Sequence, residues 1–333
     1  MRRFSCPSCE AEVFFANTAC LNCNTVLVYA PGQGFLADPE AVQCVNRSEI
    51  GCNWAAEEGS ALCLCCQHTT MVPDLTVDGN MTRWARIEAA KRPVIRSLYR
   101  LGLPLVDDTG QPVPVFELKG DALTPEGPRV LTGHEHGTIT LNIAEADDSE
   151  REARRSAMGE PYRTLAGHFR HEVAHHYWEV LTEHDPARLE TLRAVFGDDR
   201  QDYAAALQAH YSNGPPVDWM QSYISSYATA HPWEDFAETW AHVMHLLDGL
   251  ETARAFGLVS DDLPEDLGAL ASLPMQRLAD AWIDLSVALN AVNQAMGHET
   301  FYPFVLTPPV IAKMEAIRAV IAEASPVLST NPA

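Results

Sequence analysis

Near its middle the chain reads His168-Phe169-Arg170-His171-Glu172-Val173-Ala174-His175-His176-Tyr177-Trp178. This segment contains the pattern H-E-x-x-H, formed by His171, Glu172 and His175. Residues four apart on a helix lie one above the other on the same face, so the two imidazoles could bind one zinc ion. Glu172 could then reach a metal-bound water. The pattern predicts a helix with a zinc site of the kind found in peptide-cutting hydrolases.

An apolar stripe supports the helix itself. Apolar side chains recur every four residues, at Leu165, Phe169, Val173, Tyr177 and Leu181. The histidines and Glu172 fall on another face. The alternative is a histidine-rich surface helix that matches the motif by chance, although a solvated helix face normally carries Lys, Arg and Glu.

A zinc site with only two histidines is incomplete, because catalytic zinc usually takes three protein ligands and keeps one position for water. The extended motif H-E-x-x-H-x-x-G-x-x-H is absent, since Trp178 and Leu181 occupy its Gly and His positions. A later segment, residues 231–242, supplies carboxylates instead. Its second residue is Pro232, which suits the first position of a helix. Its expected buried stripe is Phe236, Trp240, Val243 and Leu247.

Two glutamates of this later helix share a different face. Glu234 and Glu238 are four residues apart, where like charges repel unless a cation lies near them. We assign Glu234 as the third zinc ligand and Glu238 as a carboxylate that orients one histidine. The alternative is an acidic first turn favoured by the helix dipole. Weaker candidates for the third ligand are Asp235, His210, Asp218 and His242.

All nine cysteines precede residue 67. A first set has the spacing of two structural-zinc knuckles, and its members are Cys6, Cys9, Cys20 and Cys23. In a looser second set only the last two cysteines have knuckle spacing; its members are Cys44, Cys52, Cys63 and Cys66. Cys65 is then left over and His68 is a rival ligand. Two closed structural zinc sites are therefore expected.

The alternative for the cysteines is a disulfide framework. The sequence Met1–Cys6 contains no apolar signal segment, which favours a cytoplasmic, reducing location where thiolates remain available for metal. A segment this short and poor in apolar residues could hardly fold without metal.

The charge of the chain restricts its partners. The formal net charge is −22, which opposes binding to nucleic acid or anionic membranes. No apolar run approaches the ~20 residues needed to cross a bilayer. The cysteine modules are more suited to docking a protein partner or packing on the rest of the chain.

The layout predicts an α+β fold: a mostly helical catalytic domain with a small antiparallel or mixed sheet, preceded by a small β-rich zinc-ribbon module. We expect a ribbon at 1–32, a second cysteine-rich zinc module at 33–75, the catalytic domain at 76–325 and a flexible tail at 326–333. Short strands are expected at 113–118 and 137–144, and the two site helices should be joined by a long acidic-to-polar connection. Further helices are expected at 84–101, 273–296 and 309–324.

The blocks H-F-R-H-E-V-A-H-H-Y-W and H-P-W-E-D-F-A-E-T-W-A-H resemble the bacterial zinc-binding metallopeptidase family with an N-terminal zinc ribbon. The resemblance extends to Cys44–Arg47, Cys52–Trp54 and Tyr302–Phe304. The later block also resembles the glutamate-ligand zincins, in which a Tyr seven residues before the ligand assists catalysis. That resemblance implies a catalytic role for Tyr227, with Tyr223, Tyr211 and Tyr177 as rivals and a buried aromatic as the alternative. It also implies that the strand before the catalytic helix binds substrate along its edge.

The sequence therefore predicts a zinc-dependent peptidase that acts on a peptide or protein, with Glu172 as the general base. We expect three zinc ions per chain, one catalytic and two structural. The competing hypothesis is a non-catalytic, zinc-stabilised scaffold that recruits a protein partner through its ribbons. Hydrolysis of a non-peptide amide is a third possibility.

Overall fold

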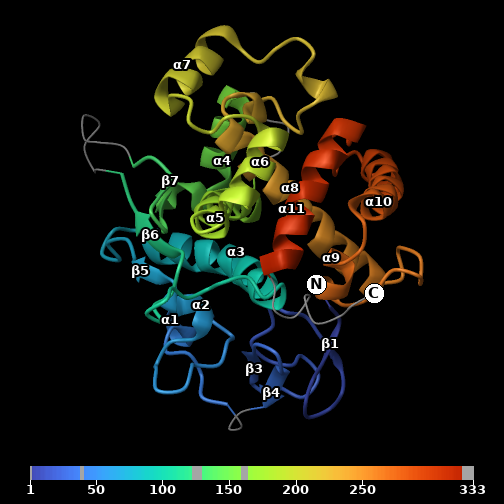
Figure 1. Ribbon diagram of the computed structural model, residues 1–333. Coiled ribbons are helices and arrows are strands. Elements are labelled where there is room, and N and C mark those ends of the chain that lie inside the picture. Colours follow the sequence, from blue (N-terminus) through green and yellow to red (C-terminus); the bar gives the residue numbers. More distant parts are fainter. Residues whose placement is uncertain (1, 38–40, 122–129, 159–163, 325–333) are drawn as a thin grey trace. The chain divides into compact units, whose positions relative to one another are not determined.

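A computed structural model of the protein describes residues 2–37, 41–121, 130–158 and 164–324 (Figure 1). The chain forms two compact units. The first contains Met1–Arg100, Pro104–Met158 and Arg163–Phe169, and the second contains Leu101–Leu103, Gly159–Tyr162 and Arg170–Ala333. The predicted tail at 326–333 lies outside the described residues.

The first unit begins with two β-hairpins. Strand β1 (Phe4–Ser5) pairs antiparallel with β2 (Glu12–Val13), and β3 (Leu27–Ala30) pairs antiparallel with β4 (Gly34–Ala37). The expected ribbon end at residue 32 thus falls in the turn between β3 and β4, where Gly32 has a φ of 79°. Two short helices follow, α1 (Arg47–Ile50) and α2 (Leu64–Gln67).

An aromatic cluster holds the cysteine-rich segments together. Tyr29 of β3 lies edge-on to Phe15, with ring centroids 4.9 Å apart, and 5.2 Å from Trp54 of the second cysteine segment. Helix α3 (Asn80–Arg100) packs on this cluster through Arg96. The Arg96 guanidinium lies 5.2 Å from the Phe15 ring centroid, and its Nε donates to the Tyr29 hydroxyl at 3.0 Å. The ribbon therefore packs on the helix that follows it.

A four-stranded mixed sheet completes the first unit. Its order is β5-β6-β8-β7, with the β5–β6 and β6–β8 pairs parallel and the β7–β8 pair antiparallel. The bounds are β5 Thr69–Met71, β6 Val115–Lys119, β7 Gly133–Glu135 and β8 Thr138–Asn142. Buried Phe116 and Leu118 alternate with partly exposed residues in β6, as the period of a strand requires. Phe116 contacts Phe169, at the start of helix α5 (Leu165–Thr182), with ring centroids 5.3 Å apart.

The expectation that the edge of the strand before the catalytic helix binds substrate is wrong for β8. This strand is an interior strand, because a turn at His136 and Gly137 folds β7 against it. His134 lies in β7, and its Nε2 accepts a hydrogen bond from the Gly137 amide. A short 3-10 helix, η1 (Ile143–Ala146), and helix α4 (Asp148–Met158) follow β8.

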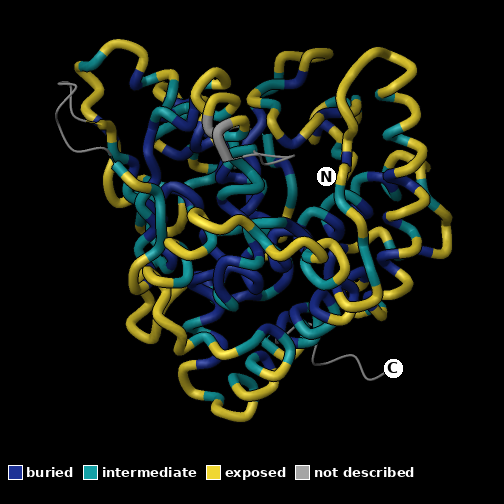
Figure 2. The backbone as a smooth tube through the Cα atoms, turned by 90° about the horizontal axis from the view of Figure 1, so that it is seen from above, coloured by how far each residue is buried: buried dark blue, intermediate teal, exposed yellow. Residues whose placement is uncertain are grey.

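The second unit is built around helix α8 (Pro232–Ala255), which contacts most of its other helices. The predicted stripe of α8 is fully buried, at Phe236, Trp240, Val243 and Leu247. In Figure 2 the buried parts of the chain are dark blue and the exposed parts yellow. Helices α9 (Leu267–Ala271), α10 (Met275–Ala295) and α11 (Pro308–Ala324) lie after α8 in the chain, close to the predicted ranges for the last two.

The segment between α5 and α8 is more ordered than the predicted long connection. It contains helices α6 (Pro186–Phe196) and α7 (Tyr203–Asn213) and the 3-10 turns η2 (Trp219–Gln221) and η3 (Tyr227–Thr229). Aspartates at 185 and 202 cap the two helices by accepting backbone amides. The prediction failed here because α7 has no buried residue and so shows no apolar stripe.

The predicted α+β class is confirmed, with a small β-rich cysteine module before a mostly helical remainder. Within the described residues, no helix combines the length and apolarity needed to cross a membrane.

Candidate metal centres

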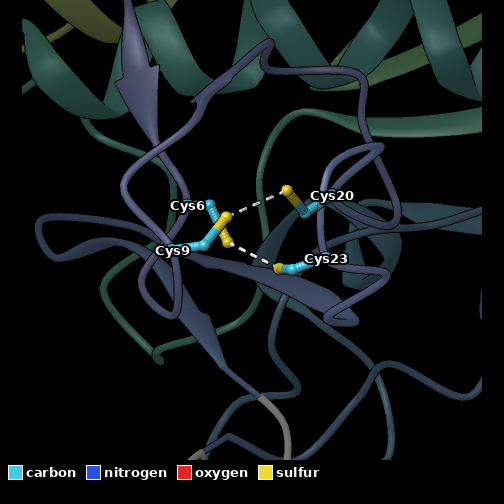
Figure 3. A group of neighbouring side chains, drawn as sticks. All are labelled: Cys6, Cys9, Cys20 and Cys23. Carbon is cyan, nitrogen blue, oxygen red and sulfur yellow. Dashed lines mark hydrogen bonds between the residues drawn. The ribbon is translucent and has the colours of Figure 1, made fainter.

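The first cysteine set forms one compact group of four sulfurs. Figure 3 shows Cys6 and Cys9 on one loop facing Cys20 and Cys23 on another. The Cys6–Cys23 and Cys9–Cys20 sulfurs are each 3.7 Å apart, far beyond the ~2.05 Å of a disulfide bond. Four sulfurs at about 2.3 Å from a zinc ion would be about 3.8 Å from one another in a tetrahedron. The group therefore has the dimensions of a closed zinc site.

The second cysteine set forms a similar group that is fully buried. Its members are Cys44, Cys52, Cys63 and Cys66. The Cys52 sulfur lies 3.6 Å from that of Cys63 and 3.8 Å from that of Cys66. Backbone amides of residues 63 and 66 donate to the sulfurs of Cys44 and Cys63, as expected around thiolates.

The two leftover candidates near this second group lie outside it. Cys65 is completely buried, and burial raises the pKa of its thiol. The ring nitrogen Nδ1 of His68 lies 2.7 Å from the Pro114 carbonyl oxygen, so this histidine serves the fold. The disulfide alternative fails, since all nine cysteines are free.

The third group joins two helices of the second unit. Its donors are His171 and His175 of α5 and Glu234 of α8. The Nε2 atoms of His171 and His175 are 3.2 Å apart, and Glu234 Oε2 lies 3.0 Å and 3.6 Å from them. Three ligands at 2.0–2.1 Å in a tetrahedral zinc site would be separated by about 3.3–3.4 Å. The three atoms thus have the spacing and chemistry of zinc ligands.

Apolar packing between α5 and α8 brings these donors together. Tyr177 stacks on Trp240 with ring centroids 5.2 Å apart, and Trp178 meets Phe236 edge-on at 4.9 Å. Both pairs lie on the buried faces of the helices. Because the helices are fixed there, their histidine and glutamate faces converge.

Glu238 connects the group to its surroundings. Its Oε1 lies 2.7 Å from Nδ1 of His171, and its Oε2 accepts the Ser225 hydroxyl at 2.6 Å. Nδ1 of His171 is the nitrogen that does not face Glu234, so a hydrogen bond there fixes the ring without occupying Nε2.

The carboxylates give the group a strong attraction for positive charge. Burial lowers the pKa of His171, but hydrogen bonds with Glu234 and Glu238 outweigh it and hold the pKa well above its ordinary value. Burial lowers the pKa of His175. Burial also opposes ionisation of Glu234, yet the charges of His175 and His171 bring its pKa down to about 2.

Two tyrosines border this group. The Tyr227 ring lies 6.0 Å from the His171 ring, and burial followed by the charge of Glu234 raises its pKa, so the hydroxyl keeps its proton. The Tyr203 hydroxyl donates to Glu234 Oε1 at 2.5 Å. Of the other tyrosines, Tyr177 is buried against Trp240.

The weaker candidates for the third ligand have other neighbours. Asp235 is buried and accepts a hydrogen bond from the Lys313 ammonium at 2.6 Å. Nδ1 of His242 lies 2.8 Å from the Tyr302 hydroxyl, and Nδ1 of His210 lies 3.2 Å from the Thr229 hydroxyl. Asp218 precedes η2 and is exposed.

Sequence reasoning missed Tyr203 and Ser225. Ser225 stands two residues before Tyr227, but nothing in the sequence marks it as a partner of Glu238. Tyr203 follows Asp202, a good helix-capping residue, which marks a helix start but no function.

Comparisons with known proteins agree with these groups. A zinc-ribbon domain matches residues 3–38 and again residues 34–77, the ranges of the two cysteine sets. An uncharacterized protein of Mycobacterium bovis is 41% identical over 332 residues, which cover 98% of this chain and 97% of that protein. Uncharacterized proteins of two strains of Mycobacterium tuberculosis show the same identity and coverage. No solved structure matches the chain significantly.

The family described as "Putative zinc-binding metallo-peptidase" matches residues 80–320, which include all donors of the third group. Zinc is therefore confirmed as the cofactor that both the family and the donor sets indicate. The family model matches most of the chain, and the two zinc-ribbon matches precede the region that it covers. The chain therefore belongs to this family of zinc-binding metallopeptidases.

Proposed function

We propose that the protein is a zinc-dependent peptidase whose centre is His171, His175 and Glu234. The observation that carries the proposal is the convergence of these three donors from α5 and α8. Among the described residues, no further His, Cys, Asp or Glu joins the group. A site with three protein ligands leaves a position for water, as hydrolysis requires, whereas a structural site is closed by a fourth ligand.

In the proposed mechanism the chain's own residues position and move protons. A bound zinc ion would lower the pKa of its water to about 7 and polarise the substrate carbonyl. Glu172, which follows His171 on α5 and is 5% exposed, accepts the proton of the attacking water and passes it to the leaving amine. Tyr227 remains protonated and donates a hydrogen bond to the carbonyl oxygen as negative charge develops there. Glu238 keeps the His171 ring oriented.

The substrate class in this proposal is a peptide or protein. A protein partner for the cysteine modules and a cytoplasmic location belong to the same proposal. The free thiols support a reducing compartment, because zinc binding requires cysteines that are not oxidised to disulfides. The net charge of −22 argues against nucleic acid as a partner.

Replacement of Glu172 tests the proposal. Glu172→Gln should reduce hydrolysis of a broad peptide library by at least about a hundredfold, because the general base is lost. Elemental analysis should still find three zinc ions per chain, since Glu172 is not among the donors of the three groups. Products would be identified by mass spectrometry.

Glu179→Gln is the matched control, because Glu179 lies two turns further along α5 and outside the three donor groups. It should cleave like the unmodified protein. If the fully zinc-loaded unmodified protein cleaves no peptide, or if Glu172→Gln cleaves as well as Glu179→Gln, the proposal is wrong. The first of these outcomes would favour the scaffold hypothesis.

A further inference from the structure

Helix α7 brings a tyrosine hydroxyl to the glutamate of the third group. The Tyr203 hydroxyl donates to Oε1 of Glu234 at 2.5 Å, while Oε2 of the same carboxylate faces the two histidines at 3.0 Å and 3.6 Å. The two oxygens therefore have separate partners. Glu234 itself is 1% exposed, so water has little access to replace the tyrosine.

The Tyr203 ring is held by the start of α8. It meets His231 edge-on at 5.3 Å and Trp233 edge-on at 5.7 Å, on either side of the first helical residue, Pro232. His231 adds a backbone link, because its Nε2 lies 3.3 Å from the Gln201 carbonyl oxygen. The ring and the hydroxyl thus both contact the turn that carries Glu234.

These contacts join the first turn of α7, yellow in Figure 1, to the metal centre. The helix has no buried residue, and Tyr203 is 37% exposed. A helix with no side chain in the core is poorly explained as a packing element. Its first residue, however, donates a short hydrogen bond to a buried carboxylate.

We propose that Tyr203 is a positioning residue that restricts Glu234 to binding the metal through Oε2 alone. The inference rests on the proposed role of Glu234 as a ligand. A carboxylate can bind a metal ion with one oxygen or with both. If Oε1 were free to turn toward the ion, Glu234 would occupy the position that hydrolysis needs for water. The tyrosine hydrogen bond holds Oε1 away from the ion and orients Oε2.

The variant Tyr203→Phe tests this role, because it keeps the ring between His231 and Trp233 and removes only the hydroxyl. Tyr211→Phe is the matched control: it removes a hydroxyl from the same helix at a residue that is 60% exposed. Zinc retained per chain would be measured during a stepwise titration with a chelator. A chain with His171→Ala and His175→Ala identifies the ion held by the third group.

Tyr203→Phe should bind the third zinc about tenfold or more weakly, as is typical when a partner of a metal ligand is removed, while Tyr211→Phe binds like the unmodified protein. Equal affinity of the two variants would overturn the proposal. Zinc in the cysteine groups and the melting temperature show whether Tyr203→Phe is folded.

Cobalt(II) placed in the third group, with zinc kept in the cysteine groups, gives a second readout. Its visible absorption weakens when a fifth ligand joins, so Tyr203→Phe should absorb less than Tyr211→Phe if Glu234 turns to bind through both oxygens. An unchanged spectrum together with unchanged affinity would assign Tyr203 to packing alone. These measurements report metal binding, so a failure of the protein to cleave peptides would refute the proposed function without deciding the role of Tyr203.

Discussion

The cysteine groups and the histidine group hold the same metal in opposite ways. Each cysteine group surrounds its ion with four thiolates from one short segment, with sulfurs 3.6–3.8 Å apart. The histidine group offers three donors from two helices that are distant in the sequence. The ion of each cysteine group holds together the short segment that supplies its ligands. The histidine group, in contrast, depends on helices that apolar packing has already placed. The ion should therefore be essential for folding in the first case and dispensable for folding in the second.

Loss of one thiolate should give the largest effect. Cys52→Ser should lower the zinc content from three ions to two and unfold the second cysteine segment, because structural zinc contributes on the order of 10 kcal/mol to such small modules. Cys65→Ala is the control: Cys65 is buried beside the group but is not one of its donors. Elemental analysis and limited proteolysis would measure both effects.

Removal of the third zinc by a chelator should, by contrast, lower the melting temperature but leave the second unit folded. If Cys52→Ser kept three zinc ions, or if loss of the third zinc unfolded the second unit, the division between the two kinds of centre would be incorrect.

Low pH should destabilise the folded protein through His242, which is buried. Burial lowers the pKa of His242 to about 4, against a smaller raising effect of Glu238. This pKa of His242 in the folded protein lies below the ~6.5 of a histidine in an unfolded chain. The unfolded chain therefore binds the proton first as the pH falls. With respect to this residue the protein is most stable above pH 6.5 and loses stability as the pH falls toward 4. The loss is about 3 kcal/mol at most. His242→Gln should flatten the fall of melting temperature in that window, whereas His184→Gln, at an exposed position, should not.

The histidine group should also depend on the residue that supports it. Glu238→Gln replaces the charged acceptor of His171 Nδ1 by a neutral one and should weaken binding of the third zinc by about 10- to 100-fold. Both cysteine groups should keep their ions, which elemental analysis during chelator titration would show. Binding as tight as in the unmodified protein would mean that the His171 ring is held by packing alone.

The smallest effect concerns the backbone of the first cysteine group. Glu10 and Asn24 each follow the second cysteine of a knuckle, with φ of 61° and 62°. Asn accepts this left-handed conformation better than Glu does. Glu10→Gly should therefore stabilise the folded segment by about 1 kcal/mol, and Asn24→Gly by less. Thermal unfolding would measure the difference, and a lower melting temperature for Glu10→Gly would contradict the interpretation.

What the sequence could predict depended on how local each feature is. His171 and His175, or Cys6 and Cys9, are brought together by one helix or one knuckle, so spacing alone indicates them. Glu234 was within reach because α8 has a clear buried stripe and a proline at its start. In each case the pattern reports a structure that forms over a few residues.

The rest depended on contacts between distant segments. The interior place of β8 results from pairing with β6 and β7, which no local pattern of β8 specifies. Helix α7 was missed because an exposed helix needs no apolar period. Tyr203 could not be found for the same reason, since only the fold brings it to Glu234.

The exposure of α7 has a consequence for how this protein can vary among organisms. Substitutions along a helix with no buried side chain cost little folding energy, so its surface can drift freely. Tyr203 is the exception if its hydroxyl serves the metal ligand. Among homologous chains we therefore expect one tyrosine to persist at the beginning of an otherwise changeable helix.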